Sequence, residues 1–249
     1  LVAFPHCSNI VGVANPVAEW VAEIHAAGAV ACVDGVSYAP HGLPDVGALG
    51  ADIYLFSAYK TYGPHQGLMV VRRALADRLP NQAHYFNAGE RTKRFTPAGP
   101  DHAQVAACAG MADYVDALYA HHVGGDAAPA ARAEAVHDLQ AEGERQRLRP
   151  LMDYLRGRND LRLIGPADSD AKVPTIAIAH AAPGAHLAEA LAARGVIAGG
   201  GDFYATRLLE ALGIDPAHGV LRMSFTHYTS DAEVERLIAA LDAVLADAA

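Results

Sequence analysis

The stretch Ile53-Tyr-Leu-Phe-Ser-Ala-Tyr-Lys-Thr-Tyr-Gly-Pro64 decides how this chain folds. Four apolar residues precede Ser57, and Lys60 follows three positions later. An earlier apolar run, Ala29–Val33, ends in the same way at Asp34. Both runs are too short for helices and are bounded by glycine or polar residues, so we predict two buried parallel strands. Ligands bind just outside the carboxyl ends of such strands, so we expect Asp34, Ser57 and Lys60 at one ligand-binding edge.

A carboxylate and an amine at one sheet edge suit pyridoxal phosphate (PLP). This cofactor needs a lysine, here Lys60, to form a Schiff base, and a carboxylate, here Asp34, to keep its pyridine nitrogen protonated. Lys60 closely follows a predicted buried strand and is flanked by aromatic residues and Gly63-Pro64, and burial there would lower its pKa and make the free amine a nucleophile. A surface lysine and a turn-forming aspartate are the simpler alternatives for these two residues.

Ser57 and Lys60 also match S-x-x-K, the nucleophile motif of penicillin-binding proteins and class A β-lactamases. The partner tripeptides S-D-N and K-T-G do not occur in this chain. A serine acylase is therefore the weaker alternative.

The remaining pattern predicts an α/β fold in two domains. In the first, strands are expected at 1–5, 29–34, 53–57 and 67–71, and helices at 16–27, near Val46, at 104–119 and at 130–158, with Pro150 kinking the last. Repeated βαβ units imply a mostly parallel sheet with right-handed crossovers. The second, smaller α+β domain is expected to have strands at 161–164, 173–179, 196–198 and 220–225 and helices at 185–194 and from 231. We place the boundary near Arg158, giving a large domain of residues 1–158 and a small domain of residues 159–249.

Four motifs, in order, resemble the class V aminotransferase family of PLP enzymes (fold type I), in its cysteine desulfurase-like branch. They are His6-Cys-Ser-Asn-Ile-Val-Gly12, Val33-Asp-Gly-Val-Ser37, Ser57-Ala-Tyr-Lys-Thr-Tyr-Gly-Pro64, and Leu221-Arg-Met-Ser-Phe225 with His227-Tyr-Thr229. The resemblance runs nearly the whole length of the chain. It implies the PLP-dependent transferase fold type I, with a PLP-binding large domain and a small C-terminal domain.

The resemblance also implies roles for single residues at the cofactor. Lys60 would form the Schiff base with PLP and move the proton at the substrate Cα, while Asp34 would pair with the pyridine nitrogen. Ser57 and Tyr59 would bind the cofactor phosphate, with Tyr59 standing where the family often has histidine. Ser37 stands where a glutamine usually touches the phenolic oxygen.

The same resemblance places three residues near the substrate. Asn9 would lie beside the cofactor ring, near the phenolic oxygen and the substrate. Arg222 would bind the substrate α-carboxylate through a bidentate pair of hydrogen bonds that lysine could not reproduce. Tyr204 lies in the loop 199–205, where cysteine desulfurases carry the cysteine that takes up sulfur. This chain has no cysteine after Cys108, so we expect no persulfide chemistry.

Two further expectations concern residues upstream of Leu1 and a second subunit. The chain starts at Leu1 on an apparent core strand without methionine, so we expect upstream residues to carry the ring-stacking residue and the phosphate loop of the family. Family members are usually homodimers, and Phe95–Pro100 corresponds to the region that completes a neighbour's phosphate site. We therefore expect a homodimer.

Composition excludes several other classes. The net charge of −9, with scattered Lys and Arg, does not form the basic footprint of a nucleic-acid-binding protein. No apolar run approaches the ~20 residues of a membrane span. Three cysteines without pairing spacing predict reduced thiols and a cytoplasmic protein. The thirteen histidines show no ligand spacing, so no metal site is predicted.

The sequence therefore predicts a PLP-dependent enzyme that removes a substituent, most simply the proton, from the Cα of an amino acid. The resulting carbanion would be delocalised into the cofactor ring. Transamination, Cα epimerisation and C–S lysis share this step and stay open. The alternative is a catalytically silent homologue that serves as a structural or dimerising partner.

Overall fold

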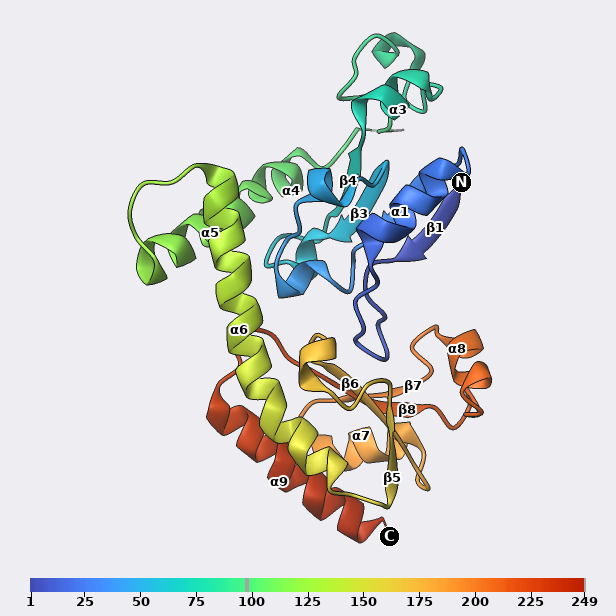
Figure 1. The fold of residues 1–249 in the computed structure, drawn as a ribbon, viewed down its shortest axis with the longest axis vertical. Helices are drawn as coiled ribbons and strands as arrows, with labels where there is room; N and C mark the ends of the chain where they lie inside the picture. The colour runs from blue at the N-terminus through green and yellow to red at the C-terminus, as the bar shows by residue number, and fades with distance from the viewer. Residues whose placement is uncertain (97–98, 249) are drawn as a thin grey trace. The chain divides into compact units, whose positions relative to one another are not determined.

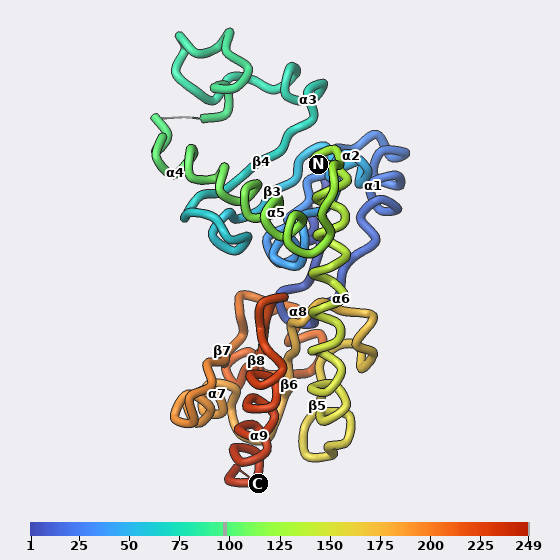
Figure 2. Tube along the Cα trace, turned by 90° about the vertical axis from the view of Figure 1, so that its left-hand side faces the viewer, coloured from blue at the N-terminus to red at the C-terminus, as the bar shows by residue number. Residues whose placement is uncertain are grey.

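The computed structural model describes residues 1–96 and 99–248. Pro97 and Ala98, in the segment Phe95–Pro100 considered above, lie outside the described residues. The chain divides into two compact units (Figures 1 and 2). The first unit contains residues 1–6 and 15–137, and the second contains residues 7–14 and those from 138 onward. The division falls inside the helix Pro129–Arg156 rather than near Arg158, and the loop of residues 7–14 belongs to the second unit. The domains 1–158 and 159–249 stay a prediction.

The first unit is built on a four-stranded sheet in the order β1-β2-β3-β4. β1, β2 and β3 pair in parallel, and β4 returns antiparallel to β3. The parallel pairs confirm the βαβ prediction, and the return strand was expected at the observed place. The elements of this unit are β1 (Val2–Pro5), α1 (Val17–Ala26), β2 (Ala31–Asp34), α2 (Val46–Leu49), β3 (Ile53–Ser57), β4 (Gly67–Val71), α3 (Arg73–Arg78), α4 (His102–Ala107) and α5 (Ala109–His122), with 3-10 turns at η1 (Ala39–His41), η2 (Ala58–Lys60) and η3 (Tyr85–Asn87).

Helices α1 and α2 cover one face of this sheet. Val17 and Val21 of α1 pack with Val33 of β2 and Tyr54 of β3, all of them buried. These residues recur at helical spacing in α1 and at strand spacing in the sheet, which is why one apolar layer can join the two.

The second unit has an antiparallel sheet in the order β5-β6-β8-β7. Its elements are β5 (Leu161–Ile164), η4 (Ser169–Ala171), β6 (Thr175–His180), α7 (Gly184–Ala192), β7 (Gly199–Gly201), α8 (Thr206–Ala211), β8 (Val220–Ser224) and α9 (Asp231–Asp247). Helix α6 (Pro129–Arg156) begins in the first unit and continues into the second.

Strand β8 alternates between two faces of this second sheet. Leu221 and Met223 point into a core made with α6, α7 and α9, which line one face in Figure 1. Val220 belongs to a second cluster on the opposite face, together with Ile10 and Leu209 of α8. Because side chains alternate along a strand, Arg222 shares the face of Val220.

Two sequence predictions differ from the structure in detail. The helix expected at 104–119 is two helices, α4 and α5, which meet at Cys108. The strand expected at 196–198 lies three residues later, at the glycines of β7, because backbone pairing with β8 rather than side-chain composition places it. Pro150 lies within α6, as expected from the sequence, and the kink at this residue stays a prediction.

Candidate active site

Asp34 lies at the carboxyl end of β2, on the edge that the sequence predicted. In the parallel pairing it stands opposite Pro5 of β1 and Leu55 of β3. Its Oδ1 accepts a hydrogen bond from the Val36 amide at 2.9 Å, and the side chain is exposed. The turn after β2 therefore orients the carboxylate while leaving it accessible.

The residue after this aspartate has to be glycine. Gly35 is buried, and a Cβ at this position would lie 2.2 Å from the Tyr54 hydroxyl. Tyr54 is fully buried, so its ring has little room to move aside. The Gly35 amide donates to the Leu55 carbonyl at 2.7 Å, which extends the pairing of β2 and β3 past Asp34.

The adjacent strand β3 delivers Ser57, and Lys60 follows in the 3-10 turn η2. This turn is held from both sides. The hydroxyl of the buried Thr61 donates to the Ser57 carbonyl at 2.5 Å, and the Gly63 amide donates to the Ala58 carbonyl at 2.8 Å. Lys60 is exposed in this chain. The turn presents its amine outward.

Tyr59 is half exposed, and its ring stacks on that of His65, with centroids 4.8 Å apart and planes 9° from parallel. Lys60 Nζ lies 6.0 Å from the centroid of the Tyr59 ring. His65 was not predicted from the sequence, although it directly follows the Gly63-Pro64 that ends the motif. The phenol predicted to bind phosphate therefore has an imidazole at its side.

Beneath this edge lies an aromatic cluster that the sequence analysis also missed. The His6 ring stacks on Tyr38 at 3.7 Å, and His6 Nδ1 forms a 2.8 Å hydrogen bond with the Tyr54 hydroxyl. Burial, helped by the nearby His137, lowers the pKa of His6 to about 4, so its ring is neutral near pH 7. Ser37 is partly buried and directly precedes Tyr38. The cluster supports the turn that carries Asp34 and Ser37.

In the second unit, Asn9 and Arg222 are brought together. Arg222 Nη1 donates to the Asn9 carbonyl at 3.0 Å, and the Asn9 amide Nδ2 donates to the Phe203 carbonyl at 2.9 Å. The Arg222 guanidinium lies 4.0 Å from the centre of the Phe203 ring. Partial burial lowers the pKa of Arg222, which stays charged because an arginine titrates far above neutrality.

Tyr204 lies next to Phe203 in the loop 199–205, and its side chain points into solvent. Its side chain is fully exposed (103%), and its φ of 61° follows a φ of 52° at Phe203. Two consecutive non-glycine residues in the left-handed region are uncommon and cost conformational energy.

The predicted site residues thus form two groups, each described within its own unit. The group on the first sheet's edge consists of Asp34, Ser37, Ser57, Tyr59 and Lys60. The group in the second unit consists of Asn9, Tyr204 and Arg222. Within the second group, Arg222 donates a hydrogen bond to Asn9.

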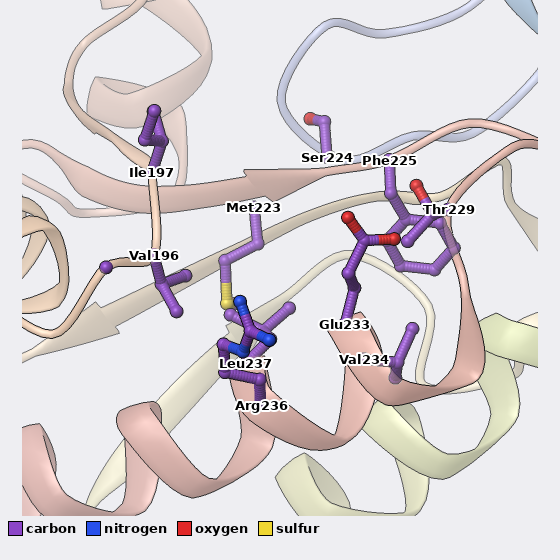
Figure 3. Close-up of a pocket in the computed structure, with 11 residues that line it drawn as sticks. Val196, Ile197, Met223, Ser224, Phe225, Thr229, Glu233, Val234, Arg236 and Leu237 are labelled. Atoms are coloured by element: carbon purple, nitrogen blue, oxygen red, sulfur yellow. The ribbon is translucent and has the colours of Figure 1, made fainter.

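Metal clusters, membrane helices and one further cavity were also considered among the described residues. Within residues 1–96 and 99–248, no cluster of three His, Cys, Asp or Glu side chains is arranged to hold a metal ion. In the same ranges no helix is both long and apolar enough to cross a membrane. A cavity of about 210 Å³ between β8 and α9 includes Glu233 (Figure 3). The Glu233 carboxylate accepts from the Ser230 amide at 2.7 Å, so it caps α9 rather than serving a ligand.

Comparison with known proteins identifies the family. The family model described as Aminotransferase class-V matches residues 1–237. The chain belongs to the class V aminotransferase family. The resemblance seen in the four motifs is thereby confirmed.

Curated relatives match most of the chain. The aminotransferase-like protein FGM3 of Gibberella zeae is 32% identical over 98% of this chain and 59% of its own length. A cysteine desulfurase of Cronobacter sakazakii is 29% identical over 97% of this chain and 57% of its own length. The class V chain therefore spans about three fifths of the length of the curated relatives it matches.

Solved structures confirm the predicted fold class. The apo cysteine desulfurase of Thermococcus onnurineus superimposes with a TM-score of 0.81 at 21% identity, over 99% of this chain and 60% of that one. The cysteine desulfurase CsdA of Escherichia coli gives a TM-score of 0.76 at 23% identity, over 98% and 58%. Both are likenesses of fold, and this class V chain covers part of that fold.

PLP is the cofactor of this family, and the residues at the first sheet's edge fit it. Asp34 offers an exposed carboxylate, and the adjacent strand offers the Ser57 hydroxyl and the exposed Lys60 amine. A carboxylate, hydroxyl and amine from neighbouring parallel strands are the donor set that a phosphorylated pyridine aldehyde requires.

Proposed function

We propose that the protein containing this chain is a PLP-dependent enzyme that acts on the Cα of an amino acid through Lys60. The observation that carries the proposal is the register of β2 and β3. Asp34 pairs with Leu55, two residues before Ser57, so acid and amine leave the sheet at the same edge.

When bound, the cofactor would supply an electron sink for the carbanion at Cα. The residues of the chain would do the rest. Asp34 would hold a proton on the pyridine nitrogen, and Ser57 and Tyr59 would hold the phosphate. The Lys60 amine would bind the aldehyde carbon and then carry the proton at Cα. Arg222 would bind the α-carboxylate, and Asn9 would tie its loop to Arg222 beside the substrate.

We further propose that this enzyme forms no persulfide in its small domain. The loop at 199–205 carries Phe203 and Tyr204 and no cysteine. The three cysteines, Cys7, Cys32 and Cys108, are free thiols, and burial raises the pKa of Cys7 to about 12, which leaves it protonated and unreactive. The relative FGM3, with 32% identity, is called aminotransferase-like rather than a desulfurase. Transamination, epimerisation and C–S lysis all agree with this loop.

Assembly and location belong to the same proposal. We expect a homodimer, as the resemblance implied, and a cytoplasmic enzyme, for which the free thiols are the supporting observation.

The test is absorbance of the purified full-length protein after addition of PLP. We expect a visible absorption band from the linkage between PLP and a lysine. Lys60→Ala should lose the band, and Asp34→Asn should keep a weaker or blue-shifted one, because the amide cannot hold the ring proton. Lys93→Ala, which removes a different lysine, is the matched control and should behave like the wild type.

Two results would count against this function. A full-length protein that never acquires the band would support the silent, structural homologue. A band that persists in Lys60→Ala would assign the cofactor to another amine.

A further inference from the structure

The Arg222 guanidinium is a half-buried cation without an anionic partner. Among residues 1–96 and 99–248, its one hydrogen bond goes to a neutral carbonyl, that of Asn9, and no carboxylate pairs with it. Placing a charge in a partly desolvated position costs free energy unless a counter-charge arrives. Nη2 and Nε remain available to an anion that approaches in the plane of the guanidinium.

The strands beside Arg222 are built to leave space on its face of the sheet. Arg222 pairs with Ala177 of β6 on one side and with Gly199 of β7 on the other. Directly opposed residues in antiparallel strands have close side chains, so these two small residues leave room above the sheet.

Phe203 fills that room on the Gly199 side. A Cβ at Gly199 would lie 2.8 Å from the Phe203 ring, closer than a carbon can approach. The ring therefore lies over Gly199 and against the guanidinium, 4.0 Å away. Gly199 is needed for this packing, which accounts for one residue of the glycine run.

The backbone holds Phe203 in place at a conformational cost. Phe203 and Tyr204 both have positive φ, at 52° and 61°. Asp202 maintains this turn: its Oδ1 accepts from the Tyr204 amide at 3.3 Å and its Oδ2 from the Thr206 hydroxyl at 3.0 Å. Strained backbone persists where the surroundings over-determine it, and it clusters at ligand-binding sites.

Three contacts close a ring around the cation. Arg222 donates to the Asn9 carbonyl, Asn9 donates to the Phe203 carbonyl, and the Phe203 ring covers the guanidinium. The aromatic face attracts the cation without neutralising it. One face of the guanidinium is thus closed, one nitrogen is occupied, and the remaining edge is held in a fixed direction.

We propose that Phe203 is a positioning residue that holds Arg222 ready for an α-carboxylate, and that the loop 199–205 serves as a support for carboxylate binding. This inference rests on the proposed function in taking an amino acid as the substrate. It assigns a task to the loop that lacks the cysteine of the desulfurase-like relatives.

The test compares L-alanine with ethylamine, which differ only in the carboxylate, on the full-length protein loaded with PLP. Dissociation constants come from the change in cofactor absorbance. We expect Phe203→Leu to weaken L-alanine binding about fivefold, since a cation–π contact contributes on this scale, and to leave ethylamine within about twofold. Phe203→Tyr, which keeps the ring, should restore wild-type binding. Phe225→Leu makes the same change in the other core cluster and should have no effect.

A second measurement needs no cofactor. Binding of sodium acetate is followed through the Nε–H signal of Arg222 by NMR, with the signal assigned from its loss in Arg222→Lys. Phe203→Leu should shift this signal and weaken acetate binding, while Phe225→Leu should do neither. Failure of the protein to take PLP would refute the proposed function but leave this measurement to decide the inference.

The inference is overturned by any of three results. Phe203→Leu could bind L-alanine and acetate as the wild type does. It could weaken L-alanine and ethylamine alike, which would indicate a general structural loss. The wild-type Arg222 signal could also fail to respond to acetate at all.

Discussion

At the scale of single residues, His6 is the position where the structure adds most to the sequence. The motif His6-Cys-Ser-Asn was recognised, but no role was given to the histidine. Its stacking on Tyr38 and its hydrogen bond to Tyr54 depend on residues more than thirty positions away in the chain. No local sequence pattern predicts such a cluster. By contrast, the positions of Asp34 and Lys60 at the sheet edge could be predicted, because Asp34 directly follows one short apolar run and Lys60 lies three residues after Ser57, which directly follows another.

The lowered pKa of His6 predicts an acid-sensitive fold. The ring has a pKa of about 4 when folded and 6.5 when exposed. Between these values the unfolded chain binds a proton that the folded chain does not, so the free energy of unfolding falls as the pH is lowered. We expect His6 to contribute roughly 2–3 kcal/mol to this loss between about pH 6.5 and 4. Urea unfolding across this range measures it.

The pH dependence of unfolding is compared between two histidine-to-asparagine variants. His6→Asn should flatten the pH dependence, while His65→Asn, which changes an exposed histidine, should retain it. Equal slopes for the wild type and His6→Asn would contradict the account of His6 as a buried neutral ring.

At the scale of elements, the positions of strands and helices were predicted well where apolar periodicity was strong. β1, β2, β3 and β4 lie where they were expected, as do α1, α7 and α9. Elements with weak patterns were missed or misplaced. Strand β7 consists of three glycines, and α3 and α8 have six residues each, so neither side-chain pattern nor length distinguished them from loops.

Pro150 gives a prediction at this scale. It lies inside α6, is exposed, and lacks the amide that would donate to the carbonyl four residues earlier. Pro150→Ala should therefore raise the free energy of unfolding by about 2 kcal/mol, somewhat less than the full helix-interior penalty of proline. The neighbouring exposed substitution Arg149→Ala should change it by no more than about 0.5 kcal/mol. An unchanged or lower stability of Pro150→Ala would show that the proline is accommodated without cost.

At the scale of the whole molecule, the chain forms two compact units, and each contains one group of the predicted site residues. The first sheet presents Asp34, Ser57 and Lys60, and the second unit holds Arg222 against Asn9 and Phe203. The family and the fold class followed from four short motifs in order. The fine division into units did not, because it depends on the contacts of residues 7–14 with the second unit, which composition does not reveal.

We propose above that Lys60 is the amine that binds PLP, and this assignment can be tested directly. The most direct measurement is borohydride reduction of the full-length protein with PLP, followed by peptide mapping. The chain contains three lysines, Lys60, Lys93 and Lys172. Burial lowers the pKa of Lys172 to about 8, which makes it the natural competitor for a free aldehyde. We expect the pyridoxyl mass on Lys60. A pyridoxyl group on Lys172 or Lys93, with Lys60 unmodified, would refute the assignment of Lys60.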